Sequence, residues 1–561
     1  MSSLSSPRLS PLSPRAGASA PAAGALGCAL VACAGLASFA GCAEDDDPDP
    51  LQRAEQALAA RGLDALRTQL VVADGKRFDH LEAYAPTGAR GFEQLTYSSE
   101  VSIDLGGRAQ RGTWSSTTVE VFPGTHREWT EVSAGQRGYV VGNDGGFPPA
   151  GAAGAPMLSS RVAARWKERA LMTPAYLVAQ GLAHREQVET LPEQRSEGHR
   201  YQVVAIAGID GWPAPVRLWL DPDTGLPARA ETTEDDPVYG DVTLGVRYDD
   251  WRQAGVTLAP FSLQVSLAGE PLLEERRSAV VDNPMLAEDA FAVPAEREGS
   301  YDAELDELGR RSSAYFLRTQ EYGAAGYADA GRAVRSTPLV TTPGAQIVLY
   351  DAAGYNTLAI ELGASIFVAE APLYDSVSTA VLADIGRRWP GKPIKYVAST
   401  HFHYDHSGGV RTYAAAGATV LAPIETADFY RAMLAAPHTL APDTLARAPR
   451  AVKVTAVGDL LTLTGGGRTV TVYNVTQSHS AGALVVYVED AKLLFTSDLY
   501  NPGFNNGPVQ GGPDAPFHDL YARELVRALT DLGLSQANLT TFVGGHGGTG
   551  TWAELRQFGG L

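Results

Sequence analysis

Length, composition and charge set the first limits on this chain. Its 561 residues exceed what one hydrophobic core usually organises, so we expect at least two folded units. With 45 basic and 64 acidic residues the net charge is −19, which argues against nucleic acid as a partner, because such binding relies on clustered Lys and Arg. All three cysteines lie within the first 42 residues, so a metal site in the folded part must use nitrogen and oxygen ligands.

The N-terminus has the pattern of an export signal. Residues 16–41 are apolar and rich in small side chains, and an acidic stretch follows at 44–49. We therefore predict a signal over 1–42 and an acidic tether over 43–50. The sequence Phe39-Ala40-Gly41-Cys42 resembles a bacterial lipoprotein signal, in which the cysteine is lipidated and becomes the new N-terminus.

The expected location is the cell envelope, periplasm or outer membrane, with a lipid anchor at Cys42. Cys33 is the alternative and lies in the better local match, but cleavage there would leave nine apolar and small residues ahead of the tether. An uncleaved membrane helix or a cleaved soluble signal are further alternatives. Beyond the signal no segment has about 18 uninterrupted apolar residues, so we expect the rest of the chain to be soluble.

Residues 51–295 are predicted to form a β-rich domain. A helical pattern occupies 51–70, and from about 91 to 293 the sequence alternates polar and apolar residues, as in 216–220, with turn signals such as 221–225. This indicates a large, curved antiparallel sheet. The run of strands resembles the half-barrels of periplasmic lipoprotein carriers. Its apolar inner face is more simply read as core than as a cradle for an acyl chain.

Residues 296–336 look like a connecting region with helical spacing around Leu305 and Leu308, and a second domain is expected over 337–561. There strands and helices alternate: 357–362 and 366–369 are predicted as paired strands, a helix should begin at Asp375, and 395–399 should be another strand. The predicted fold class is α+β.

A cluster of potential metal ligands follows that last strand. His401, His403, Asp405 and His406 lie within six residues, in Thr-His-Phe-His-Tyr-Asp-His-Ser-Gly-Gly. Extended residues 401 and 403 point two rings to one side, while 405 and 406 can turn toward a second centre. Imidazole mixed with carboxylate suits zinc, iron or manganese, so the sequence predicts a metal site here.

This His-X-His-X-Asp-His run resembles the signature of the metallo-β-lactamase superfamily. The resemblance implies three further ligands after later strands, and the sequence has them in the expected order: His479, Asp498 and His546. Each follows a predicted strand, so one rim of a layered αββα fold would gather all seven residues.

The resemblance also implies a role for each residue. His401, His403 and His479 would hold one metal, Asp405, His406 and His546 a second, and Asp498 would bridge them. Two divalent ions are implied, zinc first and iron or manganese as alternatives, sharing a hydroxide as the nucleophile. Asp405 and Asp498 are the candidate catalytic residues, with Asp405 or a metal-bound water as general acid. Thr400, Ser478 and Glu370 are candidates to orient the imidazoles, although many relatives have Asp where Glu370 stands, which leaves its role open.

Differences between this sequence and other classes of the superfamily narrow the range of expected activities. The lack of a late cysteine excludes the cysteine-containing lactamases, and His403, where diiron flavoproteins of this fold usually have Glu, argues against redox chemistry. Asp498 resembles the bridging residue of glyoxalase-type thioesterases, lactonases and phosphodiesterases. We therefore expect hydrolysis of an ester, lactone or thioester-like small molecule.

Two alternatives remain for the function. One is a β-lactam hydrolase of the cysteine-free class. The other is a ligand-carrying envelope lipoprotein with a vestigial metal domain. Tyr404, Tyr500, Asn505 and Asn506 are weaker candidates for substrate contact, since such loop residues are often turn formers. The sequence gives no indication of the oligomeric state.

Overall fold

The computed structural model describes residues 49–79, 82–86, 92–119, 124–145, 149–318, 329–503 and 517–561. The predicted signal, with Cys33 and Cys42, and nearly all of the predicted tether lie outside these ranges. Among the described residues, no helix has the length and apolar character needed to cross a bilayer.

The N-terminal region is a 13-stranded, wholly antiparallel sheet, as the alternating pattern predicts. Strand β1 (Thr68–Asp79) pairs with both β2 (Phe92–Asp104) and β13 (Glu270–Asp282), so the start and end of the region lie side by side in the sheet. The other strands are β3 (Ala109–Thr118), β4 (His126–Ala134), β5 (Arg137–Gly142), β6 (Gly151–Pro156), β7 (Val188–Ser196), β8 (His199–Ile206), β9 (Val216–Leu220), β10 (Pro227–Asp236), β11 (Gly240–Gln253) and β12 (Leu258–Leu267).

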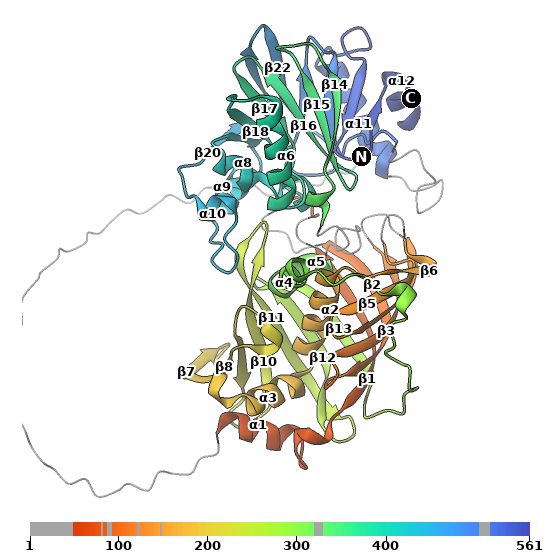
Figure 1. Ribbon diagram of the computed structural model, residues 1–561, viewed down its shortest axis with the longest axis vertical. Helices are drawn as coiled ribbons and strands as arrows, with labels where there is room; N and C mark the ends of the chain where they lie inside the picture. The colour runs from red at the N-terminus through yellow and green to blue at the C-terminus, as the bar shows by residue number, and fades with distance from the viewer. Residues whose placement is uncertain are drawn as a thin grey trace, which may run out of the picture. The chain divides into compact units, whose positions relative to one another are not determined.

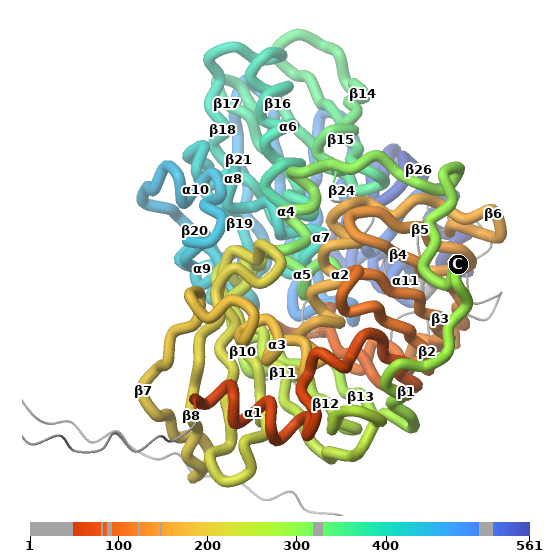
Figure 2. The backbone as a smooth tube through the Cα atoms, turned by 60° about the horizontal axis from the view of Figure 1, so that its bottom comes forward, coloured from red at the N-terminus to blue at the C-terminus, as the bar shows by residue number. Residues whose placement is uncertain are grey.

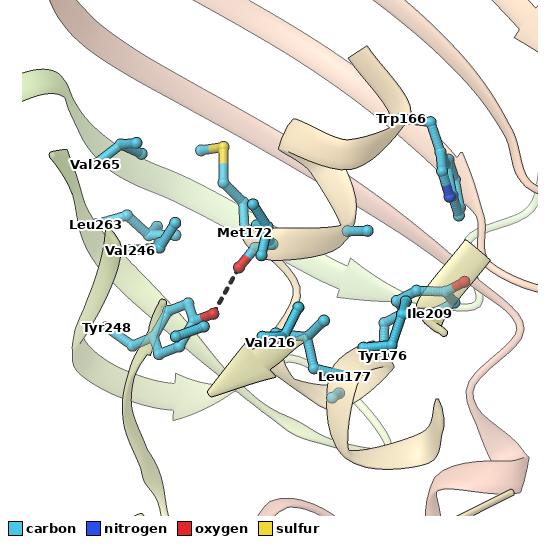
Figure 3. Close-up of a cluster of buried hydrophobic side chains, with 14 of the residues drawn as sticks. Trp166, Met172, Tyr176, Leu177, Ile209, Val216, Val246, Tyr248, Leu263 and Val265 are labelled. Atoms are coloured by element: carbon cyan, nitrogen blue, oxygen red, sulfur yellow. Dashed lines mark hydrogen bonds between the residues drawn. The ribbon is translucent and has the colours of Figure 1, made fainter. Parts of the chain in front are cut away.

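Helices fill the concave side of this sheet. Helix α2 (Ser159–Leu171) and helix α3 (Pro174–Ala183) lie among strand residues in one large apolar core, and Figure 1 shows the strands curving around α2. In Figure 3, Met172 lies opposite Val246 and Leu263, and Leu177 lies beside Val216. A cavity of about 20 Å³ remains within this core, room for about one water molecule. The apolar side chains of the inner face therefore belong to one packed core.

Two local predictions for this region are corrected. The helix expected over 51–70 is α1 (Pro50–Leu58), followed by a 3-10 turn at Leu63–Ala65, and β1 already begins at Thr68. Gly62 has a φ of 87°, which a helix cannot contain. Helices α2 and α3 lie within the stretch that was expected to be β-rich, and the alternating pattern did not predict them. The buried residues of α2 and α3 complete the core that the curved sheet cannot fill alone. Helix α1 lies beside α3 (Figure 2).

Buried ion pairs tie α2 to the sheet. The carboxylate of Glu131, on β4, accepts hydrogen bonds from Arg161 Nη2 at 2.8 Å and Arg165 Nε at 2.9 Å. Burial alone would raise the pKa of Glu131, but the two guanidinium groups outweigh it and hold the pKa well below its ordinary value. This pairing of fully buried charges fixes the helix against one side of the sheet.

Two helices connect this region to the second one. Helix α4 (Ala303–Arg311) confirms the helical spacing around Leu305 and Leu308, and the Asp302 side chain caps it. Helix α5 (Ser313–Arg318) follows. Ser313 donates a hydrogen bond to Glu234 of β10, and Tyr315 donates one to the carbonyl of Leu373 in the second region.

The second region contains two mixed sheets packed face to face between helices. The first sheet runs in the order β14-β15-β16-β17-β18-β19-β20 and the second in the order β21-β22-β23-β24-β25-β26. The strands are β14 (Arg335–Val340), β15 (Ile347–Ala352), β16 (Tyr355–Leu362), β17 (Ser365–Ala369), β18 (Ile394–Ala398), β19 (Thr419–Pro423), β20 (Lys453–Val457), β21 (Leu460–Gly465), β22 (Arg468–Val475), β23 (Ala483–Val488), β24 (Leu493–Ser497), β25 (Thr541–Gly544) and β26 (Thr549–Gly550).

Three apolar clusters define the layers. One lies between the sheets and includes Phe367 and Leu421 of the first sheet and Val472 and Phe495 of the second. The other two cover the outer faces, with one set of helices on each sheet (Figures 1 and 2). The helices are α6 (Asp375–Arg388), α7 (Tyr404–Ser407), α8 (Val410–Ala415), α9 (Ala427–Ala435), α10 (Thr444–Arg447), α11 (Phe517–Asp531) and α12 (Trp552–Phe558). The predicted αββα layering and the α+β class are confirmed.

Candidate metal centre

The strand ends of the second region bring the seven predicted ligands together. His401 and His403 follow β18, Asp405 and His406 lie in the short helix α7, and His479 follows β22. The remaining two, Asp498 and His546, follow β24 and β25. Because these strand ends meet at one rim, residues far apart in the sequence share one site.

Three imidazoles form the first group. His401, His403 and His479 each present a ring nitrogen, and these atoms lie within 4.8 Å of one another. The ring centroids of His401 and His403 are 4.5 Å apart, and the Nε2 atoms of His401 and His479 are 3.1 Å apart. Nδ1 of His403 is buried and has no hydrogen-bond partner, as expected of a nitrogen that could bind a metal.

Asp405, His406, Asp498 and His546 form the second group, again with ligand atoms within 4.8 Å. Nε2 of His406 lies 3.4 Å from Asp405 Oδ2, and Nε2 of His546 lies 3.6 Å from the same oxygen. Oδ1 of Asp405 is buried without a hydrogen-bond partner. This donor set, with nitrogen and oxygen and no sulfur, fits zinc, iron or manganese.

Asp498 lies between the two groups. Its Oδ2 atom is 3.5 Å from His479 Nε2 in the first group and 3.1 Å from His406 Nε2 in the second, while Oδ1 is 3.2 Å from His546 Nε2. The carboxylate therefore faces the donor nitrogens of both groups at once.

A family model matches most of the second region. Residues 365–539 match a family model described as "Metallo-beta-lactamase superfamily". This region is a metallo-β-lactamase superfamily domain. The match includes six of the seven residues, and His546 follows it in the chain. It does not extend to the N-terminal sheet.

Several solved structures are similar to part of this chain. A metallo-β-lactamase from Pontibacter korlensis is 17% identical, covers 40% of this chain and 98% of its own, and has a TM-score of 0.30. The metallo-β-lactamase FIM-1 from Pseudomonas aeruginosa in its mono-zinc form is 14% identical, with 40% and 94% covered and a TM-score of 0.30. The apo chemotaxis sensor ODP from T. denticola is 13% identical, with 41% and 95% covered and a TM-score of 0.31. No curated protein matches the chain.

The metallo-β-lactamase domain thus carries His/Asp clusters typical of the zinc sites of this superfamily, which is consistent with a hydrolase. Burial lowers the pKa of His401 well below its ordinary value and that of His403 to about 3, and neighbouring imidazoles add to both shifts. Both rings are therefore neutral near pH 7, the form in which imidazole binds a metal.

The pKa shifts of His406, Asp405 and Asp498 instead favour the charged form of each group. Burial disfavours a charge on His406, but Asp405, Asp498 and Glu370 outweigh it and raise its pKa well above the ordinary value. Burial likewise opposes ionisation of Asp498 and Asp405, yet His406 and His546 hold the pKa of both carboxyls below the ordinary range. Both aspartates are ionised, as metal ligands must be.

Two of the three predicted orienting residues contact an imidazole. Oε2 of Glu370 lies 2.5 Å from His406 Nδ1, so the longer side chain does reach the ring, and Glu370 also accepts from Thr400 N and Oγ1. Thr400 Oγ1 lies 3.0 Å from His401 Nδ1. Ser478 is the exception, because its backbone N and Oγ both donate to Glu524.

Two of the four weaker candidates for substrate contact have buried side chains. The Tyr404 ring is buried and packs edge-to-face on Tyr315, and Tyr500 is also buried. Both side chains therefore belong to the interior. Asn505 and Asn506 lie outside the described residues.

Other polar residues at the centre were missed from the sequence. Asn501 donates to Asp498 Oδ1 at 3.2 Å and accepts from the backbone N of His546 at 2.9 Å, which fixes the two ligands relative to each other. Its position three residues after Asp498 could have drawn attention to it. Glu82, between β1 and β2, has no such signal, yet its carboxylate lies beside His403 and Asp405.

Proposed function

We propose that residues 337–561 form a binuclear metal-dependent hydrolase that acts on an ester, lactone or thioester-like small molecule. One observation carries the proposal: the Asp498 carboxylate faces His479 of one ligand group at 3.5 Å and His546 of the other at 3.2 Å. A carboxylate that bridges two cations must face the ligands of both. Its negative charge then offsets the repulsion between two dications held close together.

His401, His403 and His479 would hold one ion, Asp405, His406 and His546 the other, and Asp498 both. Zinc fits this donor set, and iron or manganese are the alternatives. When bound, such ions activate water at neutral pH and polarise the scissile carbonyl.

Asp405 has a further proposed part in the reaction. Its pKa lies below the ordinary range, so it is ionised near pH 7 and would hold a proton only transiently. Oδ1, which is buried without a hydrogen-bond partner, is the atom proposed to take the proton of the attacking water and to deliver it to the leaving oxygen or sulfur.

Metal content followed by a substrate panel tests the proposal. The purified mature chain should bind close to two equivalents of zinc, iron or manganese after metal-replete expression. The loaded protein should then hydrolyse a phenyl ester or a homoserine lactone faster than a chromogenic cephalosporin. Less than one equivalent of metal would contradict the binuclear centre, and a preference for the cephalosporin would assign the domain to β-lactams instead.

A further inference from the structure

Residues 82–84, which lie between β1 and β2, contact the candidate metal centre. The carbonyl of Ala83 lies 3.1 Å from Nε2 of His403, and the carbonyl of Tyr84 accepts a hydrogen bond from the backbone N of Ala481. His403 follows β18 and Ala481 follows His479, so consecutive loop residues touch both chain segments that supply the first group of imidazoles.

The Ala83 contact determines which nitrogen of His403 carries hydrogen. A carbonyl oxygen only accepts, so Nε2 must donate to it. In the neutral ring Nδ1 then has a free lone pair. This nitrogen is buried without a hydrogen-bond partner, and Oε2 of Glu82 lies 3.4 Å from it.

Glu82 therefore presents its carboxylate to an acceptor atom. Its side chain is only 10% exposed, and Oε1 is also buried without a hydrogen-bond partner among the described residues. Oxygen atoms of Glu82 and Asp405 and a nitrogen of His403 lie within 4.8 Å of one another. Two buried carboxylates beside a lone pair repel one another, and a cation among them would satisfy all three.

We propose that Glu82 is an additional ligand of the metal centre, supplied by the N-terminal sheet to the ions held by the metallo-β-lactamase domain. The inference rests on the proposed metal centre and adds an eighth side chain to it. It gives the N-terminal region a chemical role, because the centre is complete only when the β1–β2 loop is in place.

Metal affinity, measured apart from turnover, tests this role. The full mature chain is stripped with a chelator and titrated with Zn²⁺ against a chromophoric competitor, as wild type, Glu82→Gln, Glu82→Asp and Glu93→Gln. Glu93 is the matched control, because it lies on the adjacent strand β2 and pairs with Lys76 on the surface. Near-UV circular dichroism of each stripped variant checks that the fold is retained.

We expect Glu82→Gln to weaken at least one of the two zinc sites by a factor on the order of 10 or more, with Glu82→Asp between it and wild type and Glu93→Gln unchanged. The Co²⁺-substituted Glu82→Gln protein should also show an altered visible spectrum, because one carboxylate ligand is lost. Equal zinc affinities and equal Co²⁺ spectra in Glu82→Gln and Glu93→Gln would overturn the role of Glu82 but leave the proposed metal centre unaffected. A wild-type chain that binds less than one equivalent of zinc would overturn the metal centre and this inference together.

Discussion

Oε2 of Glu370 lies 2.5 Å from Nδ1 of His406, and both groups are completely buried. The ring therefore directs Nε2 toward Asp405 and Asp498. A carboxylate behind a metal-binding imidazole fixes the ring orientation and makes it a better ligand.

Replacing Glu370 should loosen the metal held by His406. Glu370→Gln removes the negative charge but nearly preserves the shape, so we expect zinc affinity at the second site to fall about 10- to 100-fold. Chelator competition on the stripped protein measures the change. Thr400→Val serves as the comparison, since it removes a single hydroxyl from the same network. An unchanged affinity in Glu370→Gln would show that Glu370 only packs there.

Asp498→Ala should lower metal content and slow turnover by a factor on the order of 10² or more, because both groups lose the carboxylate that faces them. The second metal should be lost first, since three imidazoles still serve the first. Asp498→Asn should keep the fold with a weakened bridge. Asp428→Ala, at an exposed carboxylate on α9, is the control and should behave as wild type. Two retained metals and normal turnover in Asp498→Ala would contradict the bridging role.

The lack of a side chain at Gly545 leaves room for two ligands of the second group, His406 and Asp498. A Cβ atom at this position would lie 2.8 Å from His406 Cε1 and 3.1 Å from Asp498 Oδ1, closer than side chains normally permit. Gly545→Ala should therefore displace these ligands and reduce metal content while the sheets stay folded. Gly548→Ala is the matched control, since its Cβ would meet only Pro502 O, at 3.9 Å. Metal analysis of the two variants should differ, and equal values would argue against this close approach.

The buried Glu131 pairs make the N-terminal sheet sensitive to acid. The pKa of Glu131 is depressed in the folded chain, so its contribution to stability is full above the ordinary value of 4.5 and is lost as the pH falls below it. Glu131→Gln should lower the free energy of unfolding at pH 7 by about 3–5 kcal/mol, because Arg161 and Arg165 lose their partner. Urea unfolding at pH 7 and pH 4 should show a smaller acid-induced loss in the variant. The same loss in both proteins would assign acid sensitivity to other groups.

We also propose that the mature chain is an envelope lipoprotein anchored at Cys42. Cys42→Ser should move the protein from the membrane fraction to the soluble envelope fraction, because no acyl chain is then attached. Cys33→Ser is the matched variant and should leave the distribution unchanged. Membrane association that persists in Cys42→Ser but not in Cys33→Ser would transfer the anchor to Cys33, and persistence in both would indicate an uncleaved helix.

The sequence by itself determined the features that are local in the chain. His401, His403, Asp405 and His406 lie within six residues, and His479, Asp498 and His546 each follow a strand that the apolar pattern predicts. The spacing of the first four residues indicated a metal site, and the resemblance to the metallo-β-lactamase superfamily implied the three later ligands, each of which follows a predicted strand at one rim of the layered fold. The antiparallel N-terminal sheet was predictable for a similar reason, because alternation with period two is a local property.

Only the tertiary structure determined the features that depend on contacts between residues far apart in the sequence. Helices α2 and α3 fill the sheet because a curved sheet needs apolar surface on its inner side, a requirement that no single segment displays. The reach of Glu370 to His406 depends on the spacing of β17 from α7 rather than on side-chain length alone. Ala83 and His403 are 320 residues apart, and only the packing of the β1–β2 loop against the metallo-β-lactamase domain brings the Glu82 carboxylate to the metal centre.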